Sequence, residues 1–324
     1  MTTLSATSAT PELRLGLCCL NTVLRSMKPP VFASRSCIQA TLLSKGYDYV
    51  RQLARQNIAD IHTMMRWNYE HGIYVFRLSS DIFPHITNPV VDRTIYTLDD
   101  FVDELAELGE VARRYNQRIS FHPAQFNVLG TPNPKALQQT IYELHIHATI
   151  LDMMGCDSDS TMVIHGGGIY GDKEATMKRW CRNYRRLPAH IRNRLVLENC
   201  EKAFSLEDCL KISEEINIPI VLDNHHYDCY KLLHPKDIAA QTSIEDYIPR
   251  VLETWRRRGI RPEFHLSEQG CGRIGHHSDY ISQIPEYYKE IPSKYGMSVD
   301  IMIEAKMKEQ AILQLRSQLP MSSF

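Results

Sequence analysis

The sequence predicts a (β/α)8 barrel of the α/β class, a TIM barrel, and three observations support this fold. Eight apolar, strand-like runs alternate with eight helical segments along the 324 residues, and such alternation is typical of parallel strands joined by helices. One barrel with insertions accounts for a chain of this length. Six of the runs end in a histidine or a carboxylate, as expected where strand ends surround one active-site mouth. An open doubly wound sheet is the main alternative, but its strand ends would not all converge on one centre.

The strands are predicted from short apolar runs bounded by turn residues. In chain order they are residues 14–20, 74–78, 118–122, 161–165, 194–198, 218–223, 263–266 and 299–304.

The helices are predicted from the spacing of apolar residues and from terminal signals. Pro134 suits a first helical turn, and Ser205 begins a Ser-x-x-Asp pattern typical of a capping box. The basic run that ends at Arg258 suits a helix carboxyl end, and Pro285 interrupts its segment. The segments are residues 38–70, 98–115, 134–154, 173–186, 205–216, 243–258, 279–290 and 306–318.

We expect one domain over residues 13–318, with a disordered tail at residues 1–12 and a short tail at residues 319–324. The net charge of −1 gives no global electrostatic reason to bind nucleic acid, but bound cations and local basic patches could supply a positive field. Nine cysteines without a CxxC pair, and no signal peptide, indicate an intracellular protein. That means the cytoplasm of a prokaryote, or the nucleus or mitochondrion of a eukaryote. No apolar run is long enough to cross a bilayer, so no membrane partner is expected.

Metal-ligand side chains end six of the predicted strands. An ionisable group at the end of a buried strand is costly unless it is paired or bound to a metal, so six around one mouth predict a multinuclear metal site. Histidine and carboxylate ligands suit Mn²⁺, Zn²⁺ or Fe²⁺ better than they suit a thiolate site. The six residues are His122, His165, Glu198, Asp223, His265 and Glu304.

These residues also allow less specific interpretations. Either His122 or His165 alone would more often be a core histidine, and Glu198 could pair with an arginine at the rim. As a ligand, Glu198 could bridge two cations, an arrangement that suits phosphoryl chemistry. The segment at residues 223–226 could aim two ligands at one cavity or form a solvated loop. His277 could reach back over the mouth or lie exposed in its loop.

Several residues near the predicted mouth suit contact with nucleic acid. A basic stretch that includes Arg179 and Arg182 could contact phosphates, although a charge run is usually a solvated face. Lys306, just after Glu304, could also meet a phosphate. A loop pair, Gln125 and Phe126, could wedge into a duplex and stack on bases; Phe126 could equally pack on the rim.

Over residues 14 to about 310, the chain resembles the UV damage endonucleases, also called UV dimer endonucleases. The order and spacing of the shared motifs carry this resemblance. The motifs lie at residues 14–21, 76–81, 121–125, 165–171, 197–199, 222–226, 264–267 and 303–310.

The resemblance implies a metal-dependent TIM barrel similar to endonuclease IV and xylose isomerase. It implies an enzyme that nicks UV-damaged double-stranded DNA directly 5′ to cyclobutane pyrimidine dimers and 6-4 photoproducts, leaving 3′-hydroxyl and 5′-phosphate ends. A monomer is the default expectation for a repair enzyme that bends a duplex. Two or three divalent ions are implied, with Mn²⁺ expected and Zn²⁺ or Mg²⁺ as alternatives. An apurinic endonuclease of the endonuclease IV type and a sugar isomerase of the xylose isomerase type are the alternative activities.

The resemblance also implies residue roles. Glu198 would bridge two ions, His122 and His165 would complete one site, and a third ion would lie between His226 and His277. The ligands of the other bridged ion would be Asp223, His265 and Glu304. Gln125 and Phe126 match a lesion-probing pair, and Asn21 matches a residue at the site.

Three positions depart from the family pattern. Leu17 and Phe126 stand where the family often has tyrosines, so contacts to the lesion are expected there without the hydroxyls. Glu263 stands where a carboxylated lysine is common, and its carboxylate is expected to face the metals in place of that group. Glu198, Lys306 and Glu263 are therefore the expected catalytic residues.

Overall fold

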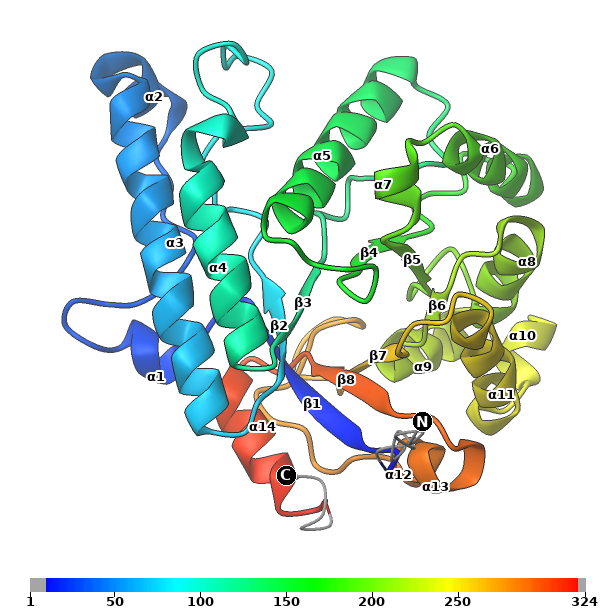
Figure 1. Ribbon diagram of the computed structural model, residues 1–324. Helices are drawn as coiled ribbons and strands as arrows, with labels where there is room; N and C mark the ends of the chain where they lie inside the picture. The colour runs from blue at the N-terminus through cyan, green and yellow to red at the C-terminus, as the bar shows by residue number, and fades with distance from the viewer. Residues whose placement is uncertain (1–9, 320–324) are drawn as a thin grey trace, which may run out of the picture.

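The computed structural model describes residues 10–319 and confirms the TIM barrel. Eight parallel strands follow one another around the barrel, and the helices lie outside them (Figure 1). β1 pairs with both β2 and β8, while β6 and β7 meet through the isolated bridge between Asp223 and His265. The strands are β1 Leu13–Cys18, β2 Val75–Leu78, β3 Arg118–Phe121, β4 Met162–His165, β5 Leu195–Glu198, β6 Ile220–Val221, β7 Glu263–Leu266 and β8 Val299–Ile303.

The helices that cover the barrel vary from single turns to 24 residues. In chain order they are α1 Thr22–Arg25, α2 Gln39–Lys45, α3 Tyr47–Glu70, η1 Leu98–Phe101, α4 Val102–Arg114, α5 Pro134–Met153, α6 Lys173–Arg185, α7 Ala189–Arg192, α8 Leu206–Ile216, α9 Asn224–Leu233, α10 Ile238–Gln241, α11 Ile244–Arg256, α12 Glu286–Lys289, α13 Ile291–Tyr295 and α14 Lys308–Arg316.

Most predicted elements are present within a few residues of their expected ends. Asn133 caps α5 directly before Pro134, and Ser205 forms the expected capping box of α8 with Asp208. The predicted tails at residues 1–12 and 319–324 lie mostly outside the described residues, which exclude 1–9 and 320–324.

Three predictions of local structure were wrong. The helix expected at residues 38–70 is two helices, because Gly46 breaks it with a positive φ of 75°. The segment at 279–290 becomes helical only at Glu286, since Pro285 lacks the N–H for an earlier turn and occupies the N-cap. The segment after Asp223, for which a solvated loop was one alternative, is the helix α9.

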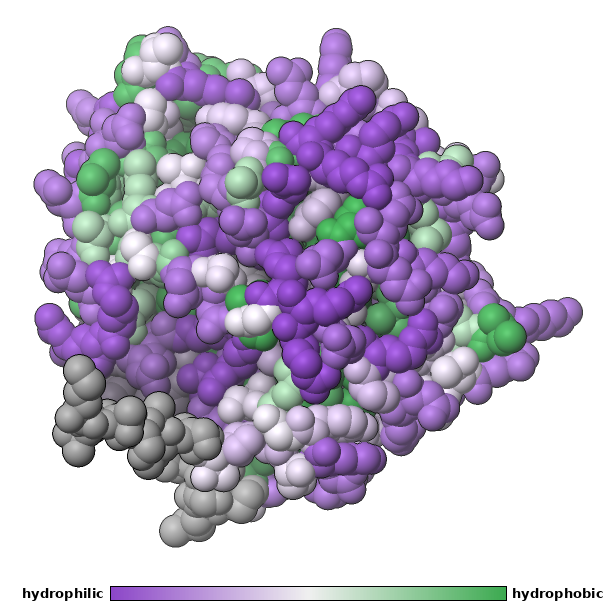
Figure 2. Space-filling model, turned by 45° about the vertical axis from the view of Figure 1, so that its right-hand side comes forward, coloured by the Kyte–Doolittle hydropathy of each residue, from purple (hydrophilic) through white to green (hydrophobic). Residues whose placement is uncertain are grey.

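Besides a small cluster of Cys18, Val75 and Met302, one hydrophobic core joins the barrel strands to the surrounding helices. Trp180 and Trp255 are fully buried in it, and α4 packs so closely on the end of α5 that a Cβ at Gly109 would lie 1.7 Å from the Met154 carbonyl oxygen. On the face seen in Figure 2, hydrophobic residues form small separate patches on a mainly hydrophilic surface. Within residues 10–319, no helix combines the length and apolarity needed to cross a bilayer.

An ion-pair network occupies the amino-terminal end of the barrel. Asp300, near the start of β8 and fully buried, accepts hydrogen bonds from Arg14 at 2.7 and 2.8 Å. Arg118 and Arg261 also donate to it, at 2.8 and 3.2 Å. Burial alone would raise the pKa of Asp300, but the hydrogen bond from Arg14 and the charges of the three arginines outweigh it and lower that pKa to about 2.

Candidate metal centre

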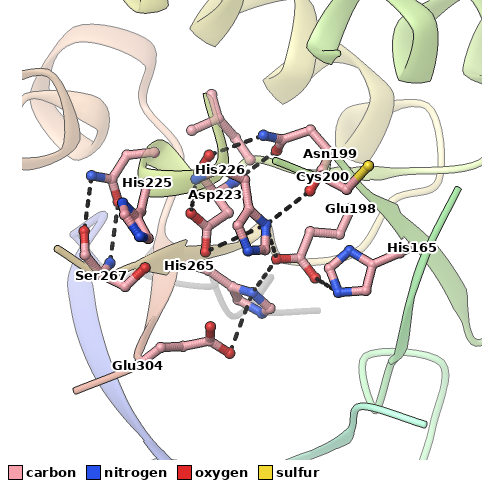
Figure 3. A network of polar contacts seen from close by, with 12 residues as sticks. His165, Glu198, Asn199, Cys200, Asp223, His225, His226, His265, Ser267 and Glu304 are labelled. Carbon is pink, nitrogen blue, oxygen red and sulfur yellow. Dashed lines mark hydrogen bonds and ion pairs between the residues drawn. The ribbon is translucent and has the colours of Figure 1, made fainter. Parts of the chain in front are cut away.

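Glu198 lies at the centre of the opposite end of the barrel, as the last residue of β5, and is fully buried. Its Oε2 lies 2.9 Å from His122 Nε2 and 3.5 Å from His165 Nε2. Its Oε1 lies 2.9 Å from His265 Nδ1 and 3.2 Å from His226 Nδ1. Figure 3 shows the imidazoles of His165, His226 and His265 directed at this carboxylate. Because each oxygen faces two imidazoles, the carboxylate has the arrangement expected of a bridging ligand.

Two groups of ligand atoms meet at Glu198. The first ligand group is His122, His165 and Glu198, and the second is Glu198, Asp223 and His265. In each group, one atom of every residue lies within 4.8 Å of the others. Both groups share Glu198, as the predicted division between two ions requires, but Glu304, also predicted for the second ion, belongs to neither group.

Asp223 and Glu304 reach this cluster from the ends of β6 and β8. Asp223 is the N-cap of α9, and its Oδ1 accepts a hydrogen bond of 2.8 Å from the backbone N–H of His226. Glu304 Oε1 lies 3.7 Å from His265 Nδ1. All six side chains predicted at strand ends therefore gather at one mouth, and a rim pairing of Glu198 with arginine is excluded by its histidine partners.

The cluster contains buried polar atoms without hydrogen-bond partners among the described residues. They are Asp223 Oδ2, His265 Nε2 and His165 Nδ1. Leaving a buried donor or acceptor unpaired costs about 1–3 kcal/mol, so three in one cluster call for an explanation. A bound cation would provide one for the carboxylate oxygen, and the nitrogen and oxygen donors fit Mn²⁺ or Zn²⁺. The residues present therefore fit a divalent metal.

The protonation of the cluster follows from burial and from facing charges. Burial lowers the pKa of His165 to about 4. Burial would also lower the pKa of His265, but the carboxylates of Glu198 and Glu304 outweigh it and raise that pKa to about 9. Burial would raise the pKa of Glu198, but the surrounding histidines outweigh this effect and hold that pKa well below its usual value. His265 makes the largest contribution among them. The protonated His265 imidazole thus offsets part of the buried negative charge.

Two residues that support the ligands were not recognised from the sequence. Arg77, on β2, donates a hydrogen bond of 2.5 Å from Nη1 to Glu304 Oε1. Asn199 accepts from the Asp223 N–H at 2.9 Å and donates to the Asp223 carbonyl at 3.0 Å, which fixes the ends of β5 and β6 against each other. For Arg77, the sequence does contain a signal: a charged residue inside the otherwise apolar run of β2.

The third ion predicted between His226 and His277 has no matching ligand group among residues 10–319. His226 Nδ1 faces Glu198 and the Asn199 carbonyl oxygen, 3.0 Å away. His277 does reach back over the mouth, where its Nε2 lies 3.8 Å from Glu304 Oε2. Its ring contacts that of His225 at 5.8 Å between centroids. The assignment of a third ion stays a prediction.

The structure corrects the expected role of Glu263. Its carboxylate is fully buried and accepts hydrogen bonds from Ser120 Oγ at 3.2 Å and Thr161 Oγ1 at 2.7 Å. Glu263 belongs to neither ligand group. Because two hydroxyls and nearby Arg118 occupy its oxygens, the carboxylate stabilises the barrel interior and does not face the metal centre.

Two expected lesion contacts also need correction. Leu17 is fully buried in the core, because the pleat of β1 turns it away from the surface. Asn21 is fully buried as well, and its Oδ1 accepts a hydrogen bond from the Leu24 N–H at the start of α1. In this conformation neither side chain can contact DNA.

The other predicted DNA contacts lie at or near the surface. Gln125 and Phe126 are exposed at the tip of a turn after β3, with Phe126 63% exposed, so the alternative of a packed rim residue is wrong. The Lys306 side chain is 56% exposed and its Nζ lies 3.6 Å from Asp279 Oδ1. Arg182 is exposed, whereas Arg179 donates to the Gly130 carbonyl at 2.6 Å.

The fold and the site define a class: β/α barrels with a histidine and carboxylate centre at the carboxyl ends of their strands. The chain belongs to the UV-endonuclease UvdE family, which its sequence matches over residues 13–323. It is therefore related to DNA repair endonucleases.

Individual relatives agree with this assignment. The UV-damage endonuclease of Schizosaccharomyces pombe is 36% identical over 93% of this chain, which spans 50% of that protein. The UV DNA damage endonuclease of Bacillus pumilus is 34% identical, with 85% of this chain and 84% of that protein covered. The chain thus spans about half of the fungal relative and most of the bacterial one.

Solved structures show the same architecture. The crystal structure of SacUVDE has a TM-score of 0.79 and 30% identity, and the match covers 94% of this chain and 97% of that chain. Endonuclease IV from Thermus thermophilus has a TM-score of 0.54 at 15% identity, covering 95% and 97%, which supports the fold alone.

Proposed function

We propose that the protein incises UV-damaged double-stranded DNA directly 5′ to cyclobutane pyrimidine dimers and 6-4 photoproducts, by metal-assisted phosphodiester hydrolysis. The observation that carries the proposal is the buried Glu198 carboxylate with two imidazoles facing each of its oxygens. A carboxylate shared in this way would suit a pair of divalent cations that assist phosphodiester hydrolysis. The names of the relatives supply the damaged-DNA substrate.

The first and second ligand groups would hold two divalent ions, Mn²⁺ by expectation, with Zn²⁺ or Mg²⁺ as alternatives; His226 and His277 are the proposed ligands of a third. When bound, such ions supply Lewis-acid stabilisation of phosphoryl oxygens and a water whose pKa is lowered toward neutrality. Glu198 fixes the spacing of the two groups because both include it. Arg77 and Asn199 hold Glu304 and Asp223 in place.

Residues around the mouth are proposed to position the DNA. Lys306, on the loop after β8, and Arg182, on α6, would contact backbone phosphates. Gln125 and Phe126 would probe the lesion from the turn after β3. Specificity would come from deformability, because a photodimer stacks poorly and costs less to bend and extrude than intact bases.

The proposal extends to the cellular compartment and the oligomeric state of the protein. All nine cysteines lie among the described residues and none is paired, which supports a reducing, intracellular compartment. A monomer is proposed, and the small apolar patches on the face in Figure 2 support it for that face.

The test is an incision assay with three matched duplexes: one with a defined photodimer, one with an abasic site and one undamaged. Each is incubated with the purified protein with and without Mn²⁺, and the ends are identified. We expect a nick directly 5′ to the photodimer, with 3′-hydroxyl and 5′-phosphate ends, only when Mn²⁺ is present. Cutting confined to the abasic duplex would replace the proposal with an apurinic endonuclease.

A matched pair of variants controls for a contaminating nuclease. Glu198→Gln removes the bridging charge, and Glu215→Gln removes an exposed carboxylate at the end of α8. Only the first should abolish incision. Equal activity of both variants would exclude the cluster from the reaction.

A further inference from the structure

A second exposed aromatic residue lies at the barrel mouth without a role so far. Tyr170 belongs to the β4 loop, residues 166–172, which starts directly after the ligand His165 and leads into α6. Its side chain is 47% exposed, and its neighbour Ile169 is 40% exposed. Large apolar side chains held in solvent beside a reaction centre suggest a contact surface.

The β4 loop packs directly on the loop that carries Phe126. A Cβ built on Gly167, whose φ is +84°, would lie 2.4 Å from a methyl carbon of Val128. Val128 is two residues beyond Phe126 and follows the turn in which the Asn127 N–H donates to the Ala124 carbonyl at 2.8 Å. Because no side chain fits between the loops, Tyr170 and Phe126 are carried by one packed unit.

Hydrogen bonds hold this unit together from behind. Arg179 donates from Nε to the Gly130 carbonyl at 2.6 Å and from Nη2 to Thr176 Oγ1 at 3.0 Å. The Thr176 hydroxyl in turn donates to the Ile169 carbonyl at 2.8 Å. The guanidinium carbon of Arg179 also lies 5.8 Å from the centre of the Tyr170 ring. Arg179 is therefore a positioning residue for both loops.

The backbone of Tyr170 has an uncommon conformation. Its φ is +48°, in the left-handed region that residues with a Cβ rarely adopt. Such conformations persist only where surrounding contacts impose them, and they cluster at functional sites. Glycine would occupy this position without strain, so the chain keeps a ring here against its backbone preference.

We propose that Tyr170 provides a stacking surface for a nucleobase that is unstacked beside the lesion, next to the surface offered by Phe126; this inference rests on the proposed function. Aromatic side chains bind unstacked bases of any sequence, because every base has a π face. The arginine behind the ring fixes its orientation. A displaced base would thus be held while the damaged strand lies at the metal centre.

The test compares Tyr170→Ala with Tyr170→Phe, which keeps the ring, and with Tyr69→Ala. Tyr69 is a matched control because it is 48% exposed at the end of α3, and its ring stacks on Tyr115, 4.9 Å away. Tyr170→Gly is added because it removes the ring and relieves the left-handed backbone, which keeps a folded variant available.

Two readouts are measured on a duplex with one photodimer and 2-aminopurine placed opposite or beside it: the Kd, and the fluorescence of the base on binding. We expect Tyr170→Ala and Tyr170→Gly to weaken binding about 5- to 100-fold and to lose most quenching of 2-aminopurine. Tyr170→Phe and Tyr69→Ala should stay within about twofold of the unmodified protein.

The outcomes separate this inference from the proposed function. An unmodified protein that does not cut the photodimer duplex would overturn the proposed function itself. If it cuts, and both ring-removing variants keep the unmodified Kd and quenching, the stacking role of Tyr170 is wrong. Lost incision with unchanged Kd and quenching would also contradict it, since the ring would then act without contacting a base.

Discussion

The two ends of the barrel each bury a carboxylate that faces four nitrogen atoms, but the nitrogens differ in chemistry. At the amino-terminal end, Arg14, Arg118 and Arg261 surround Asp300, two contacts to each oxygen. At the mouth, four histidines surround Glu198, again two to each oxygen. Arginine stays charged at any physiological pH, whereas histidine can give up its proton. The charge of the Asp300 carboxylate is thus balanced at any physiological pH, whereas the histidines around Glu198 can exchange protons for a cation.

The pattern of unpaired atoms follows the same division. Neither Asp300 nor its three arginines has a buried side-chain atom without a hydrogen-bond partner. Asp223, His165 and His265, at the mouth, each have one. The structural network and the candidate metal site are therefore alike in their buried carboxylates, but differ in the type of partner and in how many partner atoms are hydrogen-bonded.

The largest expected effect is the loss of incision when the cluster at the mouth loses Glu198. Glu198→Ala removes the residue common to both ligand groups, so incision should fall by more than about 1000-fold, since even outer partners of metal ligands cost 10- to 100-fold. The fold should survive, because the histidines can become neutral. Incision kinetics and circular dichroism check this. An active variant would remove Glu198 from the reaction.

Disrupting the Asp300 network at the amino-terminal end of the barrel should lower stability without changing incision. Asp300→Asn removes the carboxylate shared by Arg118, which is buried, and by Arg14 and Arg261, which are partly buried. Breaking such a buried pair should lower the free energy of unfolding by about 3–5 kcal/mol. Urea denaturation measures the loss, and incision under native conditions should remain. A variant with unchanged stability would mean that the arginines find other partners.

Asp300 should also make the stability of the protein depend on pH. The pKa of Asp300 is lowered from 3.8 to about 2, so its contribution is present above about pH 4 and is lost as the pH falls toward 2. The shift corresponds to roughly 2 kcal/mol. Between pH 5 and pH 2 the unmodified protein should therefore lose that much more stability than Asp300→Asn does. Parallel losses would contradict the assignment of the low pKa to this residue.

Metal binding should distinguish the two ends of the barrel. Mn²⁺ at 100 times its Kd should stabilise the protein by about 2.7 kcal/mol, because it binds the folded state alone, and a chelator should reverse the gain. Asp300→Asn should keep the full increment, and Glu198→Ala should lose it. Thermal unfolding with and without Mn²⁺ measures both. An increment retained by Glu198→Ala would place the ion elsewhere.

The smallest effect concerns the surface of the mouth. Phe126→Ala removes a side chain that is 63% exposed, so stability should change by less than about 0.5 kcal/mol. Binding to photodimer DNA should weaken roughly tenfold through lost stacking, with little change on undamaged duplex. Fluorescence anisotropy on both duplexes checks this. An equal loss on both would assign Phe126 to general DNA binding.

The barrel and the six histidines and carboxylates at its strand ends were predictable because they depend on local patterns. An apolar run followed by His165 or Glu198 marks both a strand and its end. Since parallel strand ends meet at one mouth, the ligands had to lie near one another.

The supporting contacts were not predictable, because they join residues far apart in the chain. Arg77 and Glu304 are 227 residues apart, and nothing near Arg77 shows which carboxylate it meets. The direction of Glu263 depends on hydroxyls supplied by Ser120 and Thr161. The helix α9 was missed because its cap, Asp223, was assigned only as a ligand.

The double use of Asp223 has a consequence for motion in the protein. One of its oxygens accepts a hydrogen bond from the His226 amide at the start of α9, while the other has no hydrogen-bond partner within residues 10–319. Fraying of the first turn of α9 would therefore move the Asp223 carboxylate away from the mouth, and an ion bound to that carboxylate would stabilise the turn. Deuterium uptake at the His226 amide should slow when Mn²⁺ is added, so the start of this helix would report on occupancy of the metal centre.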